Sequence, residues 1–162
     1  MDKKFEEKQD IIVSFITQSA LFCVYLEQQE QPIKSDFIEK MLWFLPFLYT
    51  KVHELPSLTP IMEGDPECFV TEEEYNLIRN NVENIMGSDD AYLEVFMEDL
   101  RYSDEPITAF ISENIADIYQ ELNNLVSNWH IDNDDIKHDA LATCMEAFKE
   151  HWGQKLVNVL RP

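Results

Sequence analysis

The residues with the clearest capacity for chemistry lie on two stretches with helical periodicity in the second half of the chain. His151 lies on the apolar stripe of the last predicted helix, and Lys155 follows one turn later. An ionisable side chain that points into a core requires a polar partner. The preceding predicted helix carries two carboxylates one turn apart, Asp117 and Glu121, which could supply that partner.

This cluster supports two interpretations. In the first, an inter-helix polar site uses His151 as a general acid or base, or as half of a metal site, so the protein is an enzyme or a metal-binding protein. In the second, which we favour, the cluster is a buried hydrogen-bonded network that fixes helix packing. His151 is then predicted to be mostly buried, and Gly153 to permit a close helix crossing. Asp117 points away from the main stripe of its own helix, which argues against the enzyme.

Two aromatic residues form a second candidate site. Trp43 and Phe47 are four residues apart and lie opposite the apolar stripe of their predicted helix. Aromatic side chains are enriched at binding hot spots, so the pair could form a partner-binding patch. The alternative, which we favour, is that a second layer of helices covers both rings.

Motif searches exclude most known catalytic and cofactor sites. The chain contains no GxGxxG, Walker loop, HExxH or GxSxG. The acidic run from Asp132 to Asp135 fails as a calcium loop because Lys137 stands where that loop requires glycine. A di-iron site needs paired Glu-x-x-His motifs, whereas Asp135 and His138 form one approximate match. The sequence therefore predicts no metal site and no cofactor.

Cysteine usage and the N-terminal composition predict a cytoplasmic protein. Cys23, Cys68 and Cys144 are odd in number and widely spaced, which fits neither a disulfide framework nor a zinc site. The apolar stretch 11–26 follows an acidic segment and is interrupted by Ser, Thr and Gln residues. These interruptions and its shortness argue against both a signal peptide and a membrane span.

Net charge restricts the partners. The 162 residues include 32 Asp and Glu against 12 Lys and Arg, a formal net charge of −20. A nucleic-acid backbone and an anionic membrane surface would both be repelled, so we expect neither as a partner. A well-solvated surface is the simpler interpretation of this charge. The alternative is a protein partner with a basic surface.

Helical periodicity accounts for most of the chain, and no segment alternates like a strand. The predicted fold class is therefore all-α, a single-domain antiparallel helical bundle of about five to six helices over residues 1–162. The expected helices run from about Asp2 to Gln29, from Ser35 or Asp36 to Val52, from Thr71 to Gly87, from Asp89 or Asp90 to Leu100, from Pro106 to Asn128, and from Asp132–Asp135 to Leu160.

Three local signals refine this prediction. Thr71 and Glu74 form a capping box at the start of their helix. Pro46 lacks a backbone donor and is predicted to kink or split the second helix. The end of the first helix is apolar nearly all round, since Leu21 and Val24 lie outside its main stripe. That end is therefore expected to be deeply buried or covered by a partner.

Two motifs carry a resemblance that extends over most of the chain. The segment Ile115–Leu122 (IADIYQEL), followed by His151-Trp152-Gly153 and Leu160-Arg161, resembles a family of small bacterial proteins known only as a domain of unknown function. A weaker likeness includes Leu48-Tyr49 and Leu55-Pro56. The resemblance implies a helical, cytoplasmic bacterial protein and brings no activity or cofactor. A second His is typical of the family where Lys155 stands, so this chain departs from a two-histidine metal site.

We therefore interpret the sequence as a non-enzymatic cytoplasmic protein-interaction module. The absent catalytic motifs, the acidic charge and the off-stripe aromatics motivate this hypothesis. The alternative remains the inter-helix polar site around His151.

Overall fold

The structure is predominantly helical, as the periodicity predicted. The computed structural model describes residues 3–94 and 107–162. Its elements are α1 (Lys3–Glu7), α2 (Gln9–Leu26), α3 (Lys34–Glu54), α4 (Glu72–Met86), a 3₁₀ turn (Gly87–Asp89), β1 (Ala91–Glu94), β2 (Ile107–Phe110), α5 (Ile111–Trp129), α6 (Asp134–Ala147), a π-helical turn (Phe148–Trp152) and α7 (Gly153–Leu160).

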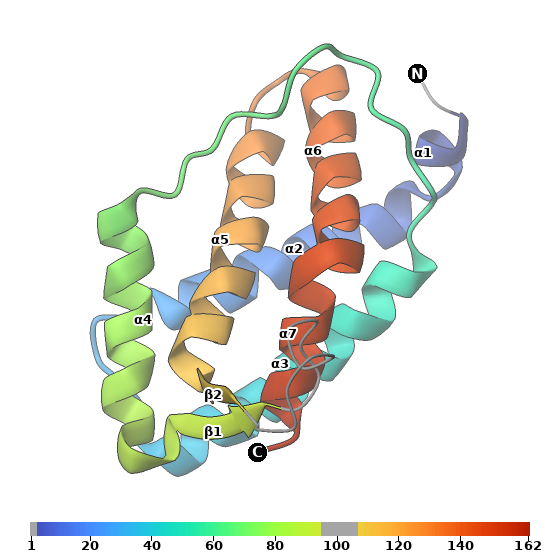
Figure 1. Cartoon of the computed structure of the whole chain (residues 1–162). Coiled ribbons are helices and arrows are strands. Elements are labelled where there is room, and N and C mark those ends of the chain that lie inside the picture. The colour runs from blue at the N-terminus through green and yellow to red at the C-terminus, as the bar shows by residue number, and fades with distance from the viewer. Residues whose placement is uncertain (1–2, 95–106) are drawn as a thin grey trace.

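The helices form two crossed layers around α5. Helices α4, α5 and α6 lie side by side in one layer, while α2 and α3 cross behind them (Figure 1). Helix α5 packs against α2, α4, α6 and α7, and its Ile115, Ile118 and Leu122 are fully buried. The connection from α3 to α4 passes over one end of α6 and α5 (Figure 1). This arrangement explains why the periodicity of α5 was the clearest in the sequence, since a helix enclosed by four others needs a broad apolar surface.

A two-stranded antiparallel sheet interrupts the helical pattern and corrects two predictions. Strand β1 pairs with β2, with Tyr92 opposite Ala109. The helix predicted from Asp89 or Asp90 is therefore wrong over 91–94, and its remainder lies outside the described residues. The helix predicted from Pro106 begins at Ile111 instead. Four-residue strands are too short for period-two alternation to be recognised in a sequence.

The carboxylate of Asp90 fixes the start of α5. It accepts hydrogen bonds from the backbone N–H and the hydroxyl of Ser112, each at 2.7 Å, while the Asp90 carbonyl accepts from the N–H of Ile111 at 2.9 Å. Free N–H groups at a helix start require such acceptors. The capping residue comes from 22 positions earlier in the chain, so no local motif marks this boundary.

Of the other predicted helix boundaries, some are confirmed and some are wrong. The predicted capping box of Thr71 and Glu74 is present at the start of α4. Helix α3 begins at Lys34 rather than after a Ser35 or Asp36 cap, and it continues unbroken through Pro46, so the predicted split is wrong. The first predicted helix is divided into α1 and α2 at Lys8.

A π-helical turn separates α6 from α7. At the end of this turn, the backbone N–H of Gly153 donates to the carbonyl of Phe148, five residues earlier. Trp152 is buried, and its indole N–H donates to the Cys144 carbonyl at 3.0 Å. A Cβ on Gly153 would lie 2.6 Å from the Phe148 oxygen, which is too close for any other residue. The glycine therefore permits a close approach within its own helix rather than the predicted helix crossing.

In the part of the chain that the structure describes, one helix is long and apolar enough to cross a membrane by its length and composition. This is α2, of which 39% is buried in the structure, and buried helices of soluble proteins share that composition. The cysteines are unpaired as predicted, with Cys23 and Cys144 buried and Cys68 exposed.

The contact at Gly153 predicts a stability effect. Replacing Gly153 with Ala forces the new methyl group against the Phe148 carbonyl, so the π-turn must shift. Overpacking of this kind costs about 1–3 kcal/mol. Urea denaturation should show this loss, whereas Lys149→Ala, at an exposed site on the same turn, should change stability little. A Gly153→Ala variant as stable as the wild type would contradict the role given to this glycine.

Candidate functional site

Asp117 joins three helices. Its carboxylate accepts a hydrogen bond from the Tyr75 hydroxyl of α4 at 2.7 Å and forms an ion pair with Lys155 of α7. Burial, followed by the hydrogen bond to the negative Asp117 carboxylate, raises the pKa of Tyr75. The sequence correctly placed Asp117 off the main stripe of α5. That direction is explained by α4 and α7, which lie on this side of the helix.

His151 lies on the surface, which contradicts its predicted burial. Its side chain is 65% exposed, and its Nε2 lies 3.7 Å from a Glu150 carboxylate oxygen. The π-turn is the physical reason for the error. In a π-turn the hydrogen bond joins residues five apart, instead of four as in an α-helix. The extra residue between Phe148 and Gly153 rotates His151 away from the apolar stripe on which Phe148 lies. The predicted four-residue network is therefore divided, with Asp117 and Lys155 paired and His151 outside.

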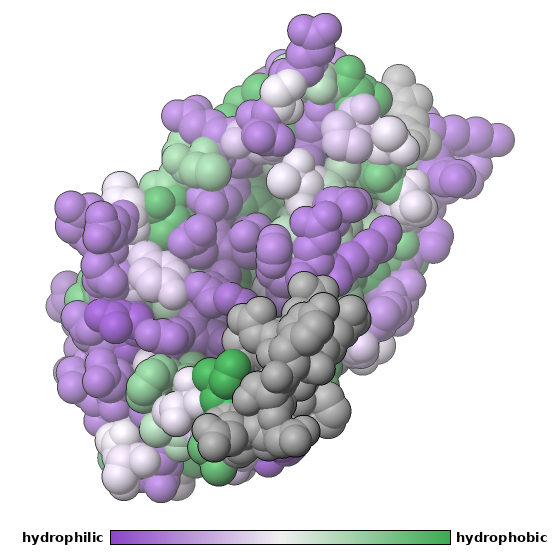
Figure 2. Space-filling model, in the orientation of Figure 1, coloured by the Kyte–Doolittle hydropathy of each residue, from purple (hydrophilic) through white to green (hydrophobic). Residues whose placement is uncertain are grey.

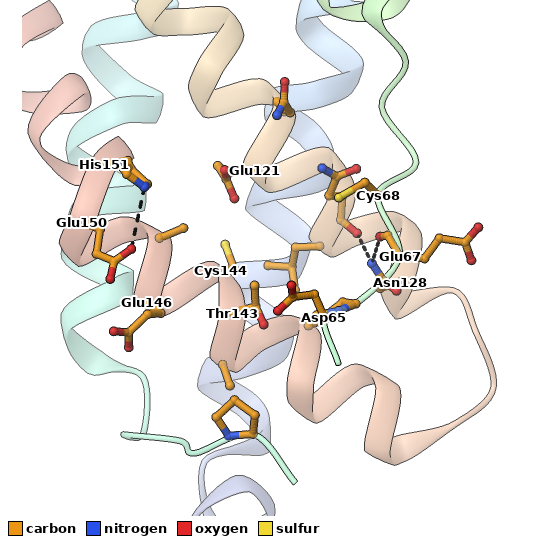
Figure 3. A pocket seen from close by; sticks show the side chains of 18 of the residues that line it. Asp65, Glu67, Cys68, Glu121, Asn128, Thr143, Cys144, Glu146, Glu150 and His151 are labelled. Atoms are coloured by element: carbon orange, nitrogen blue, oxygen red, sulfur yellow. Dashed lines mark hydrogen bonds and ion pairs between the residues drawn. The ribbon is translucent and has the colours of Figure 1, made fainter. Parts of the chain in front are cut away.

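A groove of about 530 Å³ lies between α5, α6 and the connection from α3 to α4. Glu121 lines this groove together with His151 (Figure 3). Burial raises the pKa of Glu121, and the nearby charge of Asp117 adds to that effect, although His151 and Lys155 oppose it. The lining also includes Asp65, Glu67, Cys68, Asn128, Thr143, Cys144, Glu146 and Glu150.

The groove is strongly acidic. Five carboxylates and one His line it, and the described lining residues include no Lys or Arg. In Figure 3 the Glu121 carboxylate lies between His151 on one side and Cys68 on the other. The thiol of Cys144 is buried, and burial raises its pKa, so it is held as an unreactive thiol. The chemistry available is therefore the attraction of cations and proton exchange at Glu121.

Side-chain to backbone hydrogen bonds hold the irregular wall of the groove. Asn124 of α5 accepts from the N–H groups of Phe69 and Val70 at 2.8 and 2.9 Å. Asn128 donates to the carbonyl of Glu67 at 2.9 Å. A segment without secondary structure must satisfy its backbone groups in this way. The wall therefore depends on side chains presented by α5.

Asp139 of α6 binds the connection from α3 to α4 at a second place, nearer to α3. Its carboxylate accepts from the N–H groups of Ile61 at 2.9 Å and Met62 at 2.7 Å. The buried ring of His138 lies 2.9 Å from the same carboxylate. Burial alone would raise the pKa of Asp139, but these three hydrogen bonds lower it below its ordinary value.

Within residues 3–94 and 107–162, no three His, Cys, Asp or Glu side chains converge as ligands of a metal ion would. His138 pairs with Asp139 rather than with Asp135, which is exposed at the start of α6.

The aromatic pair lies at the surface of α3. Trp43 is 54% exposed, and its ring stacks on Phe47 with centroids 5.5 Å apart and planes at 13°. Phe47 is half-buried, and the ammonium of Lys51 lies 5.5 Å from its centroid. The predicted cover by a second helix layer is therefore wrong for Trp43 in the part of the chain that the structure describes.

Comparison with known proteins places the chain in a family. The family model named Domain of unknown function (DUF5063) matches residues 6–162. The chain belongs to this family. Among solved structures, the DUF5063 domain is similar to protein BF1032 from Bacteroides fragilis, with a TM-score of 0.85 and 36% sequence identity. That similarity covers 98% of this chain and 92% of the other. No curated protein matches the sequence.

The motifs that carried the resemblance have structural roles in this DUF5063 domain. Asp117 ties α5 to α4 and α7, and the hydroxyl of Tyr119 donates to Glu27 at 2.7 Å. Trp152 and Gly153 build the π-turn. These motif residues therefore hold the helices together, and of the predicted site residues Glu121 and His151 line the groove.

Sequence reasoning missed the residues that hold the wall of the groove. Asn124, Asn128 and Asp139 bond to backbone groups more than fifty residues away, so no local pattern marks them. His138 did carry a signal. It precedes Leu141 by three positions on the same helix face, a spacing that places it on the buried stripe of α6.

The Asp117 ion pair predicts a coupling between α5 and α7. Replacing Lys155 with Met removes a charge-assisted bond to a half-buried carboxylate and should lower the unfolding free energy by about 1–3 kcal/mol. Lys149→Met is the matched control, since Lys149 is exposed on the π-turn that precedes α7. Chemical denaturation measures both variants. Equal stability of the two would contradict the role of the pair.

The lowered pKa of Asp139 predicts acid sensitivity. Its contribution to stability is complete above the ordinary Asp pKa of about 3.9 and is lost as the pH falls through the lower folded-state value. Thermal melts from neutral pH downward should therefore show a steeper loss below about pH 4 in the wild type than in Asp139→Asn. The variant should be less stable at neutral pH. Asp134→Asn, at an exposed site on the same helix, should follow the wild type.

Proposed function

We propose that this DUF5063 domain is a non-enzymatic, cytoplasmic protein-interaction module whose acidic groove receives a basic segment of a partner protein. The observation that carries the proposal is the groove of about 530 Å³, lined by five carboxylates and, among its described lining residues, by no Lys or Arg. Its volume lies within the roughly 300–1,000 Å³ of typical binding pockets.

Electrostatics supports a cationic occupant. A concave site lined by one sign of charge concentrates ligands of the opposite sign and raises their association rate. The pKa of Glu121 is raised chiefly by burial, which marks a carboxylate whose negative charge is incompletely compensated. An Arg or Lys side chain entering the groove would compensate that charge. The cytoplasmic assignment is supported by the three unpaired cysteines, of which Cys68 is exposed.

The second candidate function is an enzyme that uses the same groove. The raised pKa of Glu121 next to His151 is the observation that favours it, because a carboxyl group with a raised pKa can act as a general acid. However, His151 has its closest ion-pair contact with Glu150 outside the helix interface. The described part of the chain also lacks a metal cluster that would extend such a site, and burial raises the pKa of the Cys144 thiol.

Binding of a labelled peptide of alternating Arg and Ala residues tests the proposal. Fluorescence anisotropy should detect binding that weakens with salt, and a matched peptide of Glu and Ala should not bind. The double variant Glu121→Gln/Glu146→Gln should weaken binding about tenfold, or ~1.4 kcal/mol.

The control is Glu39→Gln/Glu83→Gln, which changes net charge equally at exposed sites on α3 and α4. It should alter the affinity less than twofold, an expectation of roughly 0.4 kcal/mol or less. If both double variants weaken binding equally, the affinity of the peptide depends only on the net charge of the protein, and the groove is not its binding site. Absence of peptide binding would also reject the proposal.

A further inference from the structure

The helix layer on the other side of the molecule carries an exposed apolar surface that the groove does not explain. Helix α2 contains one charged residue, Asp10, over its 18 positions. The side chains of Val13, Leu21 and Val24 are 46%, 49% and 57% exposed. Surface helices normally place charged and polar residues on this side. The exposed stripe of α2 therefore has the composition of a packed face.

Helix α3 extends this surface. Phe44 of α3 packs against Phe22 and Tyr25 of α2, with centroids 5.7 and 5.9 Å apart. Trp43 lies against Phe44 at 5.1 Å and stacks on Phe47. Both helices turn their buried stripes to the core, so their exposed residues lie on one outer side. We call this surface the α2–α3 outer face; it comprises Val13, Thr17, Leu21, Val24, Trp43, Pro46 and Phe47. Two lysines of α3 border it, the exposed Lys40 one turn before Trp43 and Lys51, whose ammonium lies 5.5 Å from the Phe47 centroid.

Charge is distributed unevenly between the two sides. Residues 3–54, which form α1, α2 and α3, contain six Lys and eight Asp or Glu, a net charge of −2. Residues 55–94 and 107–162 contain five Lys or Arg and nineteen Asp or Glu, a net charge of −14. The opposite side, over α4, α5 and α6, is mainly hydrophilic in Figure 2. Two copies of so acidic a chain can therefore approach each other at least electrostatic cost through the α2–α3 outer face.

We infer that the α2–α3 outer face binds a second copy of this chain, in a two-fold symmetric dimer. A two-fold interface places the same surface on both partners, and a face with few charged side chains and no carboxylate among its members is compatible with itself. The Trp43–Phe47 stack supplies the exposed aromatic anchor that protein interfaces favour.

The size of the face is sufficient. Helices α2 and α3 contain 18 and 21 residues. At about 1.5 Å per residue and an axial separation of about 8–10 Å, they present a face about 30 Å long and about 20 Å wide. That projection, ~600 Å² before side-chain corrugation is counted, approaches the ~800 Å² that each partner buries in a stable interface.

Other occupants fit the face less well. A basic protein segment is attracted to the acidic groove rather than to a surface with little charge. A bilayer fits α2 less well, because interfacial helices carry Lys or Arg along their apolar face and α2 contains neither, whereas α3 contributes only Lys40 and Lys51 beside its aromatic pair. The net charge of −20 also opposes an anionic membrane surface.

Sedimentation equilibrium of the full chain tests the inference. The wild type should have about twice the mass of the 19.1 kDa chain at micromolar concentration. Leu21→Glu and Trp43→Glu should each raise the dimer dissociation constant by about thirtyfold or more, the effect of a buried hot-spot residue. Leu77→Glu is the matched control, because Leu77 of α4 is 58% exposed outside this face.

The control variant should remain dimeric, and circular dichroism should show native helix in every variant. A monomeric wild type would overturn the inference, as would a dimer that Leu77→Glu dissociates but Leu21→Glu leaves intact. A flotation assay with phosphatidylcholine vesicles provides a further test. A monomer that floats with these vesicles, and loses that property on Leu21→Glu, would assign the face to a membrane and also overturn the dimer.

Discussion

The structure depends on the pairing of polar groups along α5, a helix enclosed by four others. Its apolar residues are buried with little constraint on their partners, whereas each inward polar side chain requires a specific one. Several of these residues bond to other elements of the fold. Ser112 bonds to Asp90 before β1, Asp117 to α4 and α7, Tyr119 to the end of α2, and Asn128 to the connection after α3. These bonds fix the position of each neighbour along the central helix.

The groove is a consequence of this arrangement. The connection from α3 to α4 has no regular secondary structure over 56–71, yet it remains folded against the bundle because Asn124, Asn128 and Asp139 bind its backbone. It spans α5 and α6 without closing the space between them, and carboxylates line that space. A backbone held by hydrogen bonds to side chains leaves a concavity where helix packing would have filled it. The same interactions that stabilise the fold therefore shape its candidate site.

The molecule separates its charge from its apolar surface. Most of the negative charge of the described residues lies in 55–94 and 107–162, the part of the chain that includes the groove, and the exposed apolar residues of α2 and α3 lie on the other layer. Such separation allows two kinds of contact without interference. A charged groove selects partners by the sign of their charge, whereas an apolar face selects partners by the complementarity of their shape. It also explains the composition of α2, which is more apolar than its burial requires.

The sequence by itself determined the helical class, the extents of α3 and α4, the capping box of α4 and the off-stripe direction of Asp117, because these properties follow from local periodicity and capping chemistry. It also identified Trp43 and Phe47 as lying outside the core stripe. Tertiary structure decided the rest. The hairpin and the start of α5 depend on Asp90 acting across 22 residues, and the wall of the groove depends on contacts across more than fifty. His151 was misplaced because one π-turn breaks the helical period, and that turn is set by the close approach of Gly153 to Phe148, which a count of apolar spacings does not contain.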